Sequence, residues 1–451
     1  MKRKKDNFYS LKPGHVTMYV CGMTVYDHCH IGHARVMVFF DLVKRWFEAK
    51  GFTVTYVRNI TDIDDKIIKR ASDEKVGVNE YTKRYIKELH DDEKSLFIQK
   101  PSFEPQATKY VPEMIELIEK LVKKDYAYIS ETGDVNFAVR SFRDYGKLSG
   151  KSIEQLRVGH RISIDEKKRD PLDFVLWKGA KQGEPDDVIW KSPFGAGRPG
   201  WHIECSAMSN ALLGKRFDIH GGGADLQFPH HENEIAQSCA SVNSDNPEDY
   251  AKYWIHNGFV TIDGEKMSKS LNNIILLNNL LKDHDGETIR LALLSSHYRK
   301  SLDWNENVLK QSKVLLDKVY DFLNTCEDEP EGEIDKSLIE NFSNDLDIPK
   351  VLTFINELLK NRNSSNARTI KQSLLFAGGI LGVFNKKPSE WNKQTEISDI
   401  ELAEIEKLIN ERKILKENKD FSSADAIRDS LLEKGIELID NEDGTTWKSK
   451  N

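Results

Sequence analysis

Near the N-terminus, side chains that could bind a phosphate or a metal crowd into one short stretch. They are Cys21, His30, Gly32 and His33. A buried-strand pattern over residues 16–20 precedes them, and apolar residues with helical spacing follow. Where a parallel strand leads into a helix, the helix N-terminus attracts phosphate and a glycine lets a ligand approach the backbone. This favours a phosphate-binding site, with a plain strand–turn–helix carrying surface histidines as the alternative.

A second set of residues has the types that zinc prefers, which are thiolate, imidazole and carboxylate. Its members are Cys21, Cys205, His230 and Glu234. His230 and Glu234 are four residues apart, so on a helix they face the same side. His231 and Glu232 offer the same ligand types, and a solvated helix face is the alternative for this whole run. Because the sequence has no Cys-x-x-Cys pair, spacing alone leaves the ligand set open.

A polar loop over residues 263–270 contains the run Lys-Met-Ser-Lys-Ser. Such a loop could fold over a triphosphate, and the ammonium groups of Lys266 and Lys269 could neutralise the charge that develops as pyrophosphate leaves. An ordinary solvated loop is the alternative. The order of the two motifs is informative, because His-Ile-Gly-His opens an α/β unit and the lysine run closes it.

The whole chain has the composition of a globular protein with several domains: 451 residues, 39% hydrophobic and 31% charged. Five scattered cysteines predict no disulfide framework. No apolar run reaches the roughly 20 residues of a membrane helix, and none follows the basic start as a secretory signal would, so we expect a cytoplasmic chain. A net charge of −7 argues against a general nucleic-acid coat. The basic run within residues 140–169 is then a solvated face or a local contact.

Strand-like and helical segments alternate in the first part of the chain, which predicts an α/β unit with a parallel sheet. The expected strands are 16–20, 53–57, 217–220 and 254–260, and the expected helices include 67–97, 201–213 and 230–239. Residues 126–180 are more β-like and irregular, and we interpret them as an insertion. From about residue 280 the pattern is helical, and the tail has two helices, 400–416 and 422–434, followed by a hairpin.

The two motifs together resemble those of the class I aminoacyl-tRNA synthetases. Longer runs resemble the cysteinyl-tRNA synthetases: residues 21–33, 59–66, 170–178, 197–206, 218–223 and 228–234, with a tail over 419–447 similar to that of the bacterial enzymes. The resemblance implies a Rossmann-type α/β catalytic domain with an inserted segment, followed by a helical bundle and a small C-terminal α+β anticodon-binding module. The implied divisions are 1–112 and 197–300 for the catalytic halves, 113–196 for the insertion, 301–390 for the bundle and 391–451 for the module.

The resemblance also implies roles for single residues. It implies one Zn²⁺ held by Cys21, Cys205, His230 and Glu234. It implies ATP, accompanied by Mg²⁺, bound by His30, Gly32, His33, Asp225 and Lys269, with His30, His33, Lys266 and Lys269 acting in catalysis. Thr61, Trp201 and Asp225 would line the amino-acid pocket. Asp425, Arg428, Asp440 and Trp447 would lie at the anticodon, where Lys416 replaces a usual Arg and loses its planar fork.

The implied reaction is activation of L-cysteine by ATP and its transfer to tRNA(Cys), with zinc selecting the substrate thiolate over a hydroxyl. The resemblance further suggests a monomer that does not bind membranes. A ligase that passes activated cysteine to a small-molecule amine is one alternative, but it would not need the tail. A non-catalytic tRNA- or zinc-binding protein is another, and the two intact nucleotide motifs argue against it.

Overall fold

The computed structural model describes residues 5–152, 155, 168–268, 271–326, 332–363, 365–391, 399–418, 420–433, 436–441 and 444–449. Lys269 therefore lies outside the described residues. The chain divides into two compact units. The first comprises Met1–Leu309, Ile339–Leu352 and Ile380–Val383, and the second comprises Lys310–Leu338, Thr353–Gly379 and Phe384–Asn451.

A parallel four-stranded sheet forms the centre of the first unit, in the order β2-β1-β7-β8. The strands are β1 (His15–Val20), β2 (Thr53–Arg58), β7 (Phe217–Gly223) and β8 (Ala251–Asn257). In the register, Met18 of β1 lies opposite Tyr56 on one side and Ile219 on the other. The predicted parallel sheet is thus confirmed, and it brings the carboxyl ends of β1 and β7 together although some 200 residues separate them.

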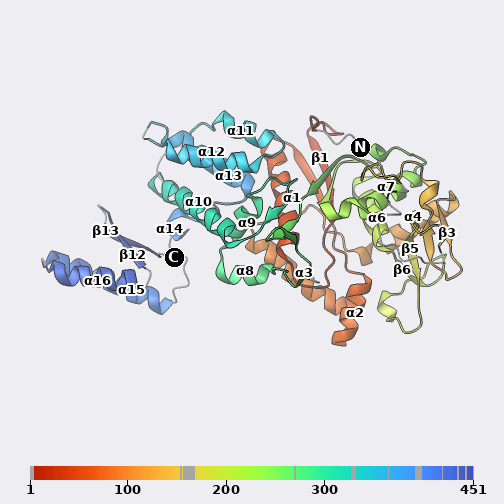
Figure 1. The fold of residues 1–451 in the computed structure, drawn as a ribbon, viewed down its shortest axis with the longest axis horizontal. Helices are drawn as coiled ribbons and strands as arrows, with labels where there is room; N and C mark the ends of the chain where they lie inside the picture. The colour runs from red at the N-terminus through yellow and green to blue at the C-terminus, as the bar shows by residue number, and fades with distance from the viewer. Residues whose placement is uncertain are drawn as a thin grey trace. The chain divides into compact units, whose positions relative to one another are not determined.

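Helix α1 (Ile31–Ala49) connects β1 to β2 (Figure 1), and its apolar face packs on the sheet. Phe39, Phe40 and Val43 pack on β1 residues such as Met18. This burial removes large aromatic and aliphatic areas from water and so stabilises the helix on the sheet. The first turn of α1 is consequently held at the carboxyl edge of β1, where ligands bind in open parallel sheets.

Further elements surround this sheet (Figure 1). The helices are α2 (Asp65–Glu74), α3 (Val78–Ser95), α4 (Val111–Lys123), α6 (Trp201–Leu213), α7 (His230–Ser241), α8 (Leu277–Asp283) and α9 (Gly286–Leu294). An antiparallel sheet, β3-β4-β5-β6, comprises Ala127–Ile129, Val135–Phe137, Phe174–Gly179 and Gly197–Pro199. A small sheet, β10-β9-β11, comprises Glu265–Lys266, Val260–Ile262 and Leu302–Asp303.

The strand expected over 254–260 is wrong in its extent. It is two strands, because β8 ends at Asn257 and β9 begins at Val260. The break falls at Gly258, where the backbone comes so close to residue 300 that a Cβ would lie 2.3 Å from the Lys300 carbonyl oxygen. Periodicity along the chain carries no signal for such a contact with a distant segment.

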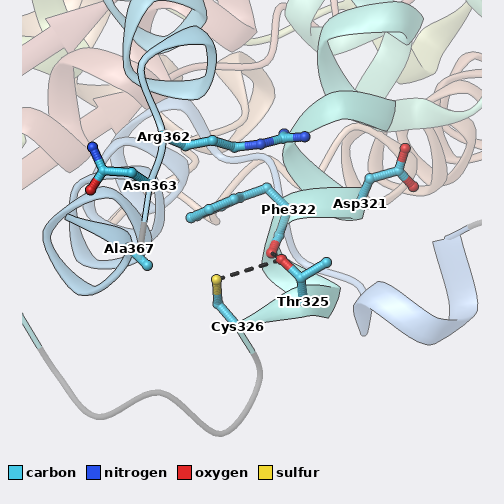
Figure 2. Close-up of a pocket in the computed structure, with 7 residues that line it drawn as sticks. All are labelled: Asp321, Phe322, Thr325, Cys326, Arg362, Asn363 and Ala367. Carbon is cyan, nitrogen blue, oxygen red and sulfur yellow. Dashed lines mark hydrogen bonds between the residues drawn. The ribbon is translucent and has the colours of Figure 1, made fainter. Parts of the chain in front are cut away.

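The second unit is mainly helical. Its helices include α10 (Glu306–Thr325), α12 (Ile348–Lys360), α13 (Ala367–Leu381) and α14 (Pro388–Trp391), and α11 (Lys336–Ser343) precedes α12. Parts of α10, α11 and α12, and the last two residues of α13, belong to the first unit. A pocket of about 270 Å³ is bordered by Phe322 of α10, Arg362 and Ala367 (Figure 2). None of the site residues predicted from sequence lines it.

The C-terminal part contains α15 (Asp399–Glu417), α16 (Phe421–Glu433) and an antiparallel hairpin of β12 (Ile436–Asn441) and β13 (Gly444–Ser449). Ile405, Leu431, Ile436 and Leu438 form its small core. The expected two helices and hairpin are therefore confirmed. No helix in the described part of the chain has both the length and the apolar character needed to cross a bilayer.

Candidate metal and nucleotide site

Three segments converge at the carboxyl edge of the parallel sheet. Cys21 directly follows β1, Cys205 lies on α6, and His230 and Glu234 lie on the first turns of α7. The ligand atoms of these four buried residues all lie within 4.8 Å of one another. Cys21 Sγ is 3.5 Å from Cys205 Sγ and 3.3 Å from Glu234 Oε1, and His230 Nε2 is 3.1 Å from the same oxygen. The fold thus brings together the four residues predicted from sequence.

The protonation of the cluster suits a metal. Burial raises the pKa of Cys205, but hydrogen bonds with Cys21 and His230 lower it to about 6. Burial also raises the pKa of Glu234, but His220 and His230 lower it to about 2. A thiolate and a carboxylate at neutral pH, beside a second thiol and an imidazole, form a donor set that zinc prefers. The residues present therefore fit a zinc ion.

One oxygen of Glu234 faces the cluster and the other is held from behind. Glu234 Oε2 accepts a hydrogen bond from Tyr250 Oη at 2.9 Å, and it lies 2.8 Å from His220 Nε2. Such outer partners orient a ligand and tune its basicity. Sequence reasoning missed both residues as part of the site: His220 stands in a run that resembles the family, whereas no motif contains Tyr250.

Spacing had left Glu232 and His231 open as alternative metal ligands, and the structure gives each of them other partners. Glu232 is buried and accepts hydrogen bonds from the backbone N–H groups of Gly146 and Ser149, each at 2.9 Å, so its carboxylate is committed elsewhere. His231 forms a second candidate group with Cys21, His220 and Glu234. Its Nδ1 lies 2.9 Å from His256 Nε2. The two groups share Cys21 and Glu234, and the group with Cys205 and His230 offers two thiols where this one offers a single thiol.

The residues predicted for the amino-acid pocket lie around this cluster. The Trp201 ring stacks on the His230 ring, with centroids 4.3 Å apart. Asp225 follows β7. Burial lowers the pKa of His230, but Glu234, Cys205 and, to a smaller extent, the charge of Asp225 raise it above its usual value. Thr61 is buried and donates a hydrogen bond to Glu204 at 2.9 Å, so it borders the cluster through its neighbours rather than directly.

The predicted nucleotide residues form the first turn of α1. His30 is the N-cap, and its Nδ1 accepts hydrogen bonds from the N–H groups of Gly32 at 3.1 Å and His33 at 3.3 Å. The two imidazole rings stack with centroids 3.6 Å apart. Because Nδ1 accepts, the neutral ring carries its proton on Nε2 and can donate it to an anion. Because the backbone N–H groups of Gly32 and His33 already donate to His30 Nδ1, the Nε2–H of His30 is the candidate donor to an anion at this helix N-terminus.

The lysine run meets this turn. A Cβ on Gly32 would lie 3.3 Å from Met267 Cε, so the two motifs are in contact. After the run, the backbone pairs with residues around the start of α1: Ile31 N–H donates to Ile275 O at 3.1 Å, and Leu277 N–H donates to Cys29 O at 2.9 Å. Lys266 Nζ lies over the Phe259 ring, 4.0 Å from its centroid.

The predicted anticodon residues lie in the C-terminal part. Asp425 and Arg428 are exposed on α16, and Trp447 lies on β13 against the small core. Asp440 is engaged within the chain, because both of its oxygens accept hydrogen bonds from Arg412, at 2.8 and 3.0 Å, and Lys416 Nζ lies 3.2 Å away. Its role at an anticodon stays a prediction.

Solved structures with a similar fold are aminoacyl-tRNA synthetases. The methionyl-tRNA synthetase of Mycobacterium tuberculosis, in complex with methionyl-adenylate, has a TM-score of 0.56 at 14% identity, covering 82% of this chain and 89% of that chain. A LeuRS of Agrobacterium radiobacter, in a ternary complex with tRNA and LeuAMS, has a TM-score of 0.60 at 11% identity, covering 85% of each chain. These likenesses show the class I synthetase fold.

Sequence comparisons are more specific. The family model described as the tRNA synthetases class I (C) catalytic domain matches residues 7–314. The cysteine–tRNA ligase of Laribacter hongkongensis is 46% identical over 460 positions, covering 99% of this chain and 98% of that protein. That of an Acidovorax species is 48% identical over 455 positions, covering 100% and 98%. The resemblance drawn from the motifs is therefore confirmed, and the chain belongs to the cysteine–tRNA ligases, a family of class I aminoacyl-tRNA synthetases.

Proposed function

We propose that this chain activates L-cysteine with ATP and transfers it to tRNA(Cys). One observation supports this most directly: a buried Cys–Cys–His–Glu cluster lies at the same sheet edge as a helix N-terminus capped by His30. A thiol-selective site beside an anion site is what cysteine activation requires. The fold and the full-length similarity to cysteine–tRNA ligases agree with it.

Cys21, Cys205, His230 and Glu234 would hold a zinc ion. When bound, zinc supplies an affinity for thiolate that a serine hydroxyl cannot match. The chain's own residues then orient the amino acid: the Trp201 ring, stacked on His230, borders the pocket, and Asp225 provides a carboxylate close to His230. Rejection of serine at the binding step would make a separate editing domain unnecessary.

In the activation step, a carboxylate oxygen of cysteine attacks the α-phosphorus of ATP. A new P–O bond forms, the bond to the β-phosphate oxygen breaks, and pyrophosphate leaves with Mg²⁺. His30 and His33 donate N–H groups toward the phosphate oxygens at the α1 N-terminus, with Gly32 allowing close approach. Lys266 and Lys269 neutralise the departing pyrophosphate. Catalysis is then positioning and electrostatic stabilisation, without a protein nucleophile.

In the transfer step, a terminal ribose hydroxyl of the tRNA attacks the activated carbonyl, and AMP leaves. We assign tRNA selection to the C-terminal module, with Asp425, Arg428 and Trp447 as the candidate anticodon contacts. Asp440 would act by fixing the Arg412 and Lys416 side chains rather than by reading a base itself. We further propose that the enzyme is a monomer in the cytoplasm, and light scattering on the purified chain tests the oligomeric state.

Cysteine-dependent ATP–pyrophosphate exchange, followed by charging of tRNA(Cys), tests the function. We expect both activities, and we expect Cys205→Ser to lose bound zinc and exchange together. Full exchange by a zinc-free Cys205→Ser variant would refute the metal's role. Exchange without any tRNA charging would favour a ligase that uses a small-molecule amine, and absence of both would favour a non-catalytic binding protein.

Removal of residues 390–451 tests the tail. Because the catalytic edge belongs to the first compact unit, we expect the shortened chain to retain pyrophosphate exchange and to lose most tRNA charging. An equal loss of both activities would argue against a separate anticodon role for the tail.

A further inference from the structure

The guanidinium of Arg35 connects the two nucleotide motifs. We propose that Arg35 is a positioning residue for the activation step, which fixes the hairpin carrying Lys266 against the helix turn carrying His30 and His33. This inference rests on the function proposed above and adds to it a residue that neither motif contains.

Arg35 is 2% exposed and lies two residues after His33 on α1. Its Nη1 donates to the carbonyl oxygens of Gly258 at 2.8 Å and Phe259 at 2.6 Å. Its Nη2 donates to Ser296 Oγ at 2.8 Å and to the carbonyl oxygen of Lys300 at 2.9 Å. All four acceptors are neutral, and three of them are backbone carbonyls, so this side chain is not neutralising a partner. It is joining α1 to two other segments.

Those two segments lead directly into strands of the small sheet β10-β9-β11. Gly258 and Phe259 directly precede β9, and Lys300 stands two residues before β11. The two segments also bind each other, because Gly258 N–H donates to Tyr298 O at 2.6 Å and Leu302 N–H donates to Phe259 O at 2.9 Å. Arg35 therefore fixes the sheet at its base.

The sheet in turn carries Lys266. Lys266 is the last residue of β10, and its backbone pairs with Thr261 of β9. Its ammonium group lies 4.0 Å from the centroid of the Phe259 ring, on the residue whose carbonyl oxygen Arg35 binds. A short path of contacts thus runs from the His30 turn through Arg35 and Phe259 to the lysine.

Arginine suits this position because its planar guanidinium has five N–H donors in a fixed fork. Burial lowers the pKa of Arg35 to about 10, so the group stays protonated at neutral pH. A lysine has its three donors on one nitrogen, so it cannot bind the acceptors before β9 and those before β11 at the same time, as the guanidinium does. Arg35→Lys therefore keeps the charge but loosens the hairpin.

The test is a double-mutant cycle on cysteine-dependent pyrophosphate exchange, using the full-length enzyme. The variants are Arg35→Lys, Lys266→Ala and the double substitution. We expect Arg35→Lys to lower kcat roughly 10- to 100-fold, because small misplacements of a catalytic group cost that much, while KM for cysteine changes less than twofold. In the double variant, kcat should fall little further than in Lys266→Ala alone, because Arg35 acts through that lysine.

Arg290 provides a matched control. It is fully buried, and it donates to the carbonyl oxygens of Leu381 at 2.6 Å and Leu96 at 2.9 Å and pairs with Asp41. These partners lie outside the lysine hairpin. Arg290→Lys should lower the unfolding temperature, and its effect on kcat should simply add to that of Lys266→Ala. This separates positioning from general loss of stability.

Additive losses for Arg35→Lys and Lys266→Ala, or a kcat within twofold of wild type for folded Arg35→Lys, would overturn the inference. If Arg35→Lys does not fold, Ser296→Ala replaces it, because that variant removes only the hydroxyl that accepts a hydrogen bond from Arg35 Nη2 at 2.8 Å. Its effect must likewise be non-additive with Lys266→Ala, and additivity overturns the inference. A wild-type chain without cysteine-dependent exchange would overturn the proposed function, and this inference with it.

Discussion

Replacing Tyr250 by phenylalanine removes a single hydroxyl from behind the candidate metal ligand Glu234. Tyr250 is 1% exposed, and its Oη donates to Glu234 Oε2 at 2.9 Å and lies 2.9 Å from Ser209 Oγ. The ring itself packs against Phe217, with centroids 5.1 Å apart, and that packing remains in the variant. The substitution therefore changes the orientation and basicity of one carboxylate with little change in shape.

The expected change in zinc affinity depends on the partner that Glu234 keeps in the variant. Loss of an outer partner of a metal ligand typically costs about 10- to 100-fold in metal affinity, or roughly 1.4–2.7 kcal/mol. His220 Nε2 still lies 2.8 Å from Glu234 Oε2 and continues to hold that oxygen. We therefore expect Tyr250→Phe to raise the Kd for Zn²⁺ by about tenfold, the lower end of that range.

The assay is competition for Zn²⁺ with a coloured chelator, supported by the absorption bands of bound Co²⁺, which report ligand geometry. Tyr298→Phe is the matched control, because Tyr298 is 6% exposed and its hydroxyl donates to another carboxylate, Asp345, at 2.8 Å. Both variants lose one hydroxyl hydrogen bond to a carboxylate, about 1.5–3 kcal/mol of stability. An unchanged Kd for Zn²⁺ in Tyr250→Phe, or an equal change in both variants, would refute the reasoning.

Three further predictions concern other parts of the chain. Glu232→Gln turns an amide N–H₂ toward backbone donors that now point at a carboxylate, so urea unfolding should show a loss of about 1–3 kcal/mol, whereas the exposed Glu248→Gln should change little. Gly32→Ala places a methyl group 3.0 Å from the His30 ring. Exchange kinetics should then show KM for ATP raised roughly 2- to 10-fold, which corresponds to the free energy of about one hydrogen bond. An unchanged KM for ATP would contradict close approach of the ligand to this backbone. Arg412 holds the pKa of Asp440 well below its usual range, so this pair stabilises the hairpin above the unfolded value of about 3.9 and the stabilisation is lost as pH falls toward the folded pKa. The protection factors of the β12–β13 amides, which correct for the intrinsic slowing of exchange in acid, should fall below about pH 4, and Arg412→Gln should weaken that dependence.

Much of the fold could be predicted because it is local. The apolar run over residues 16–20 and the helical spacing after His33 place a strand, a turn and a helix, and the structure has β1 and α1 there. The tail helices and hairpin follow from the same kind of periodicity. Boundaries were less predictable, as in the strand expected over 254–260, because Gly258 is shaped by contact with Lys300.

The sequence by itself determined the order of the elements, the two nucleotide motifs and the family, since these depend on residues that are neighbours along the chain. Spacing along the chain did not decide which like residues share a site: the family resemblance implied Glu234, and the tertiary structure shows the physical reason. Glu232 and Glu234 are two residues apart on one helix, yet one carboxylate binds the backbone near Gly146 and the other joins Cys21 and Cys205. Tyr250 and Arg35 acquire their proposed roles in the same way, through partners that packing brings close. A residue's type states what it can bind, whereas the fold determines what stands within hydrogen-bonding distance of it.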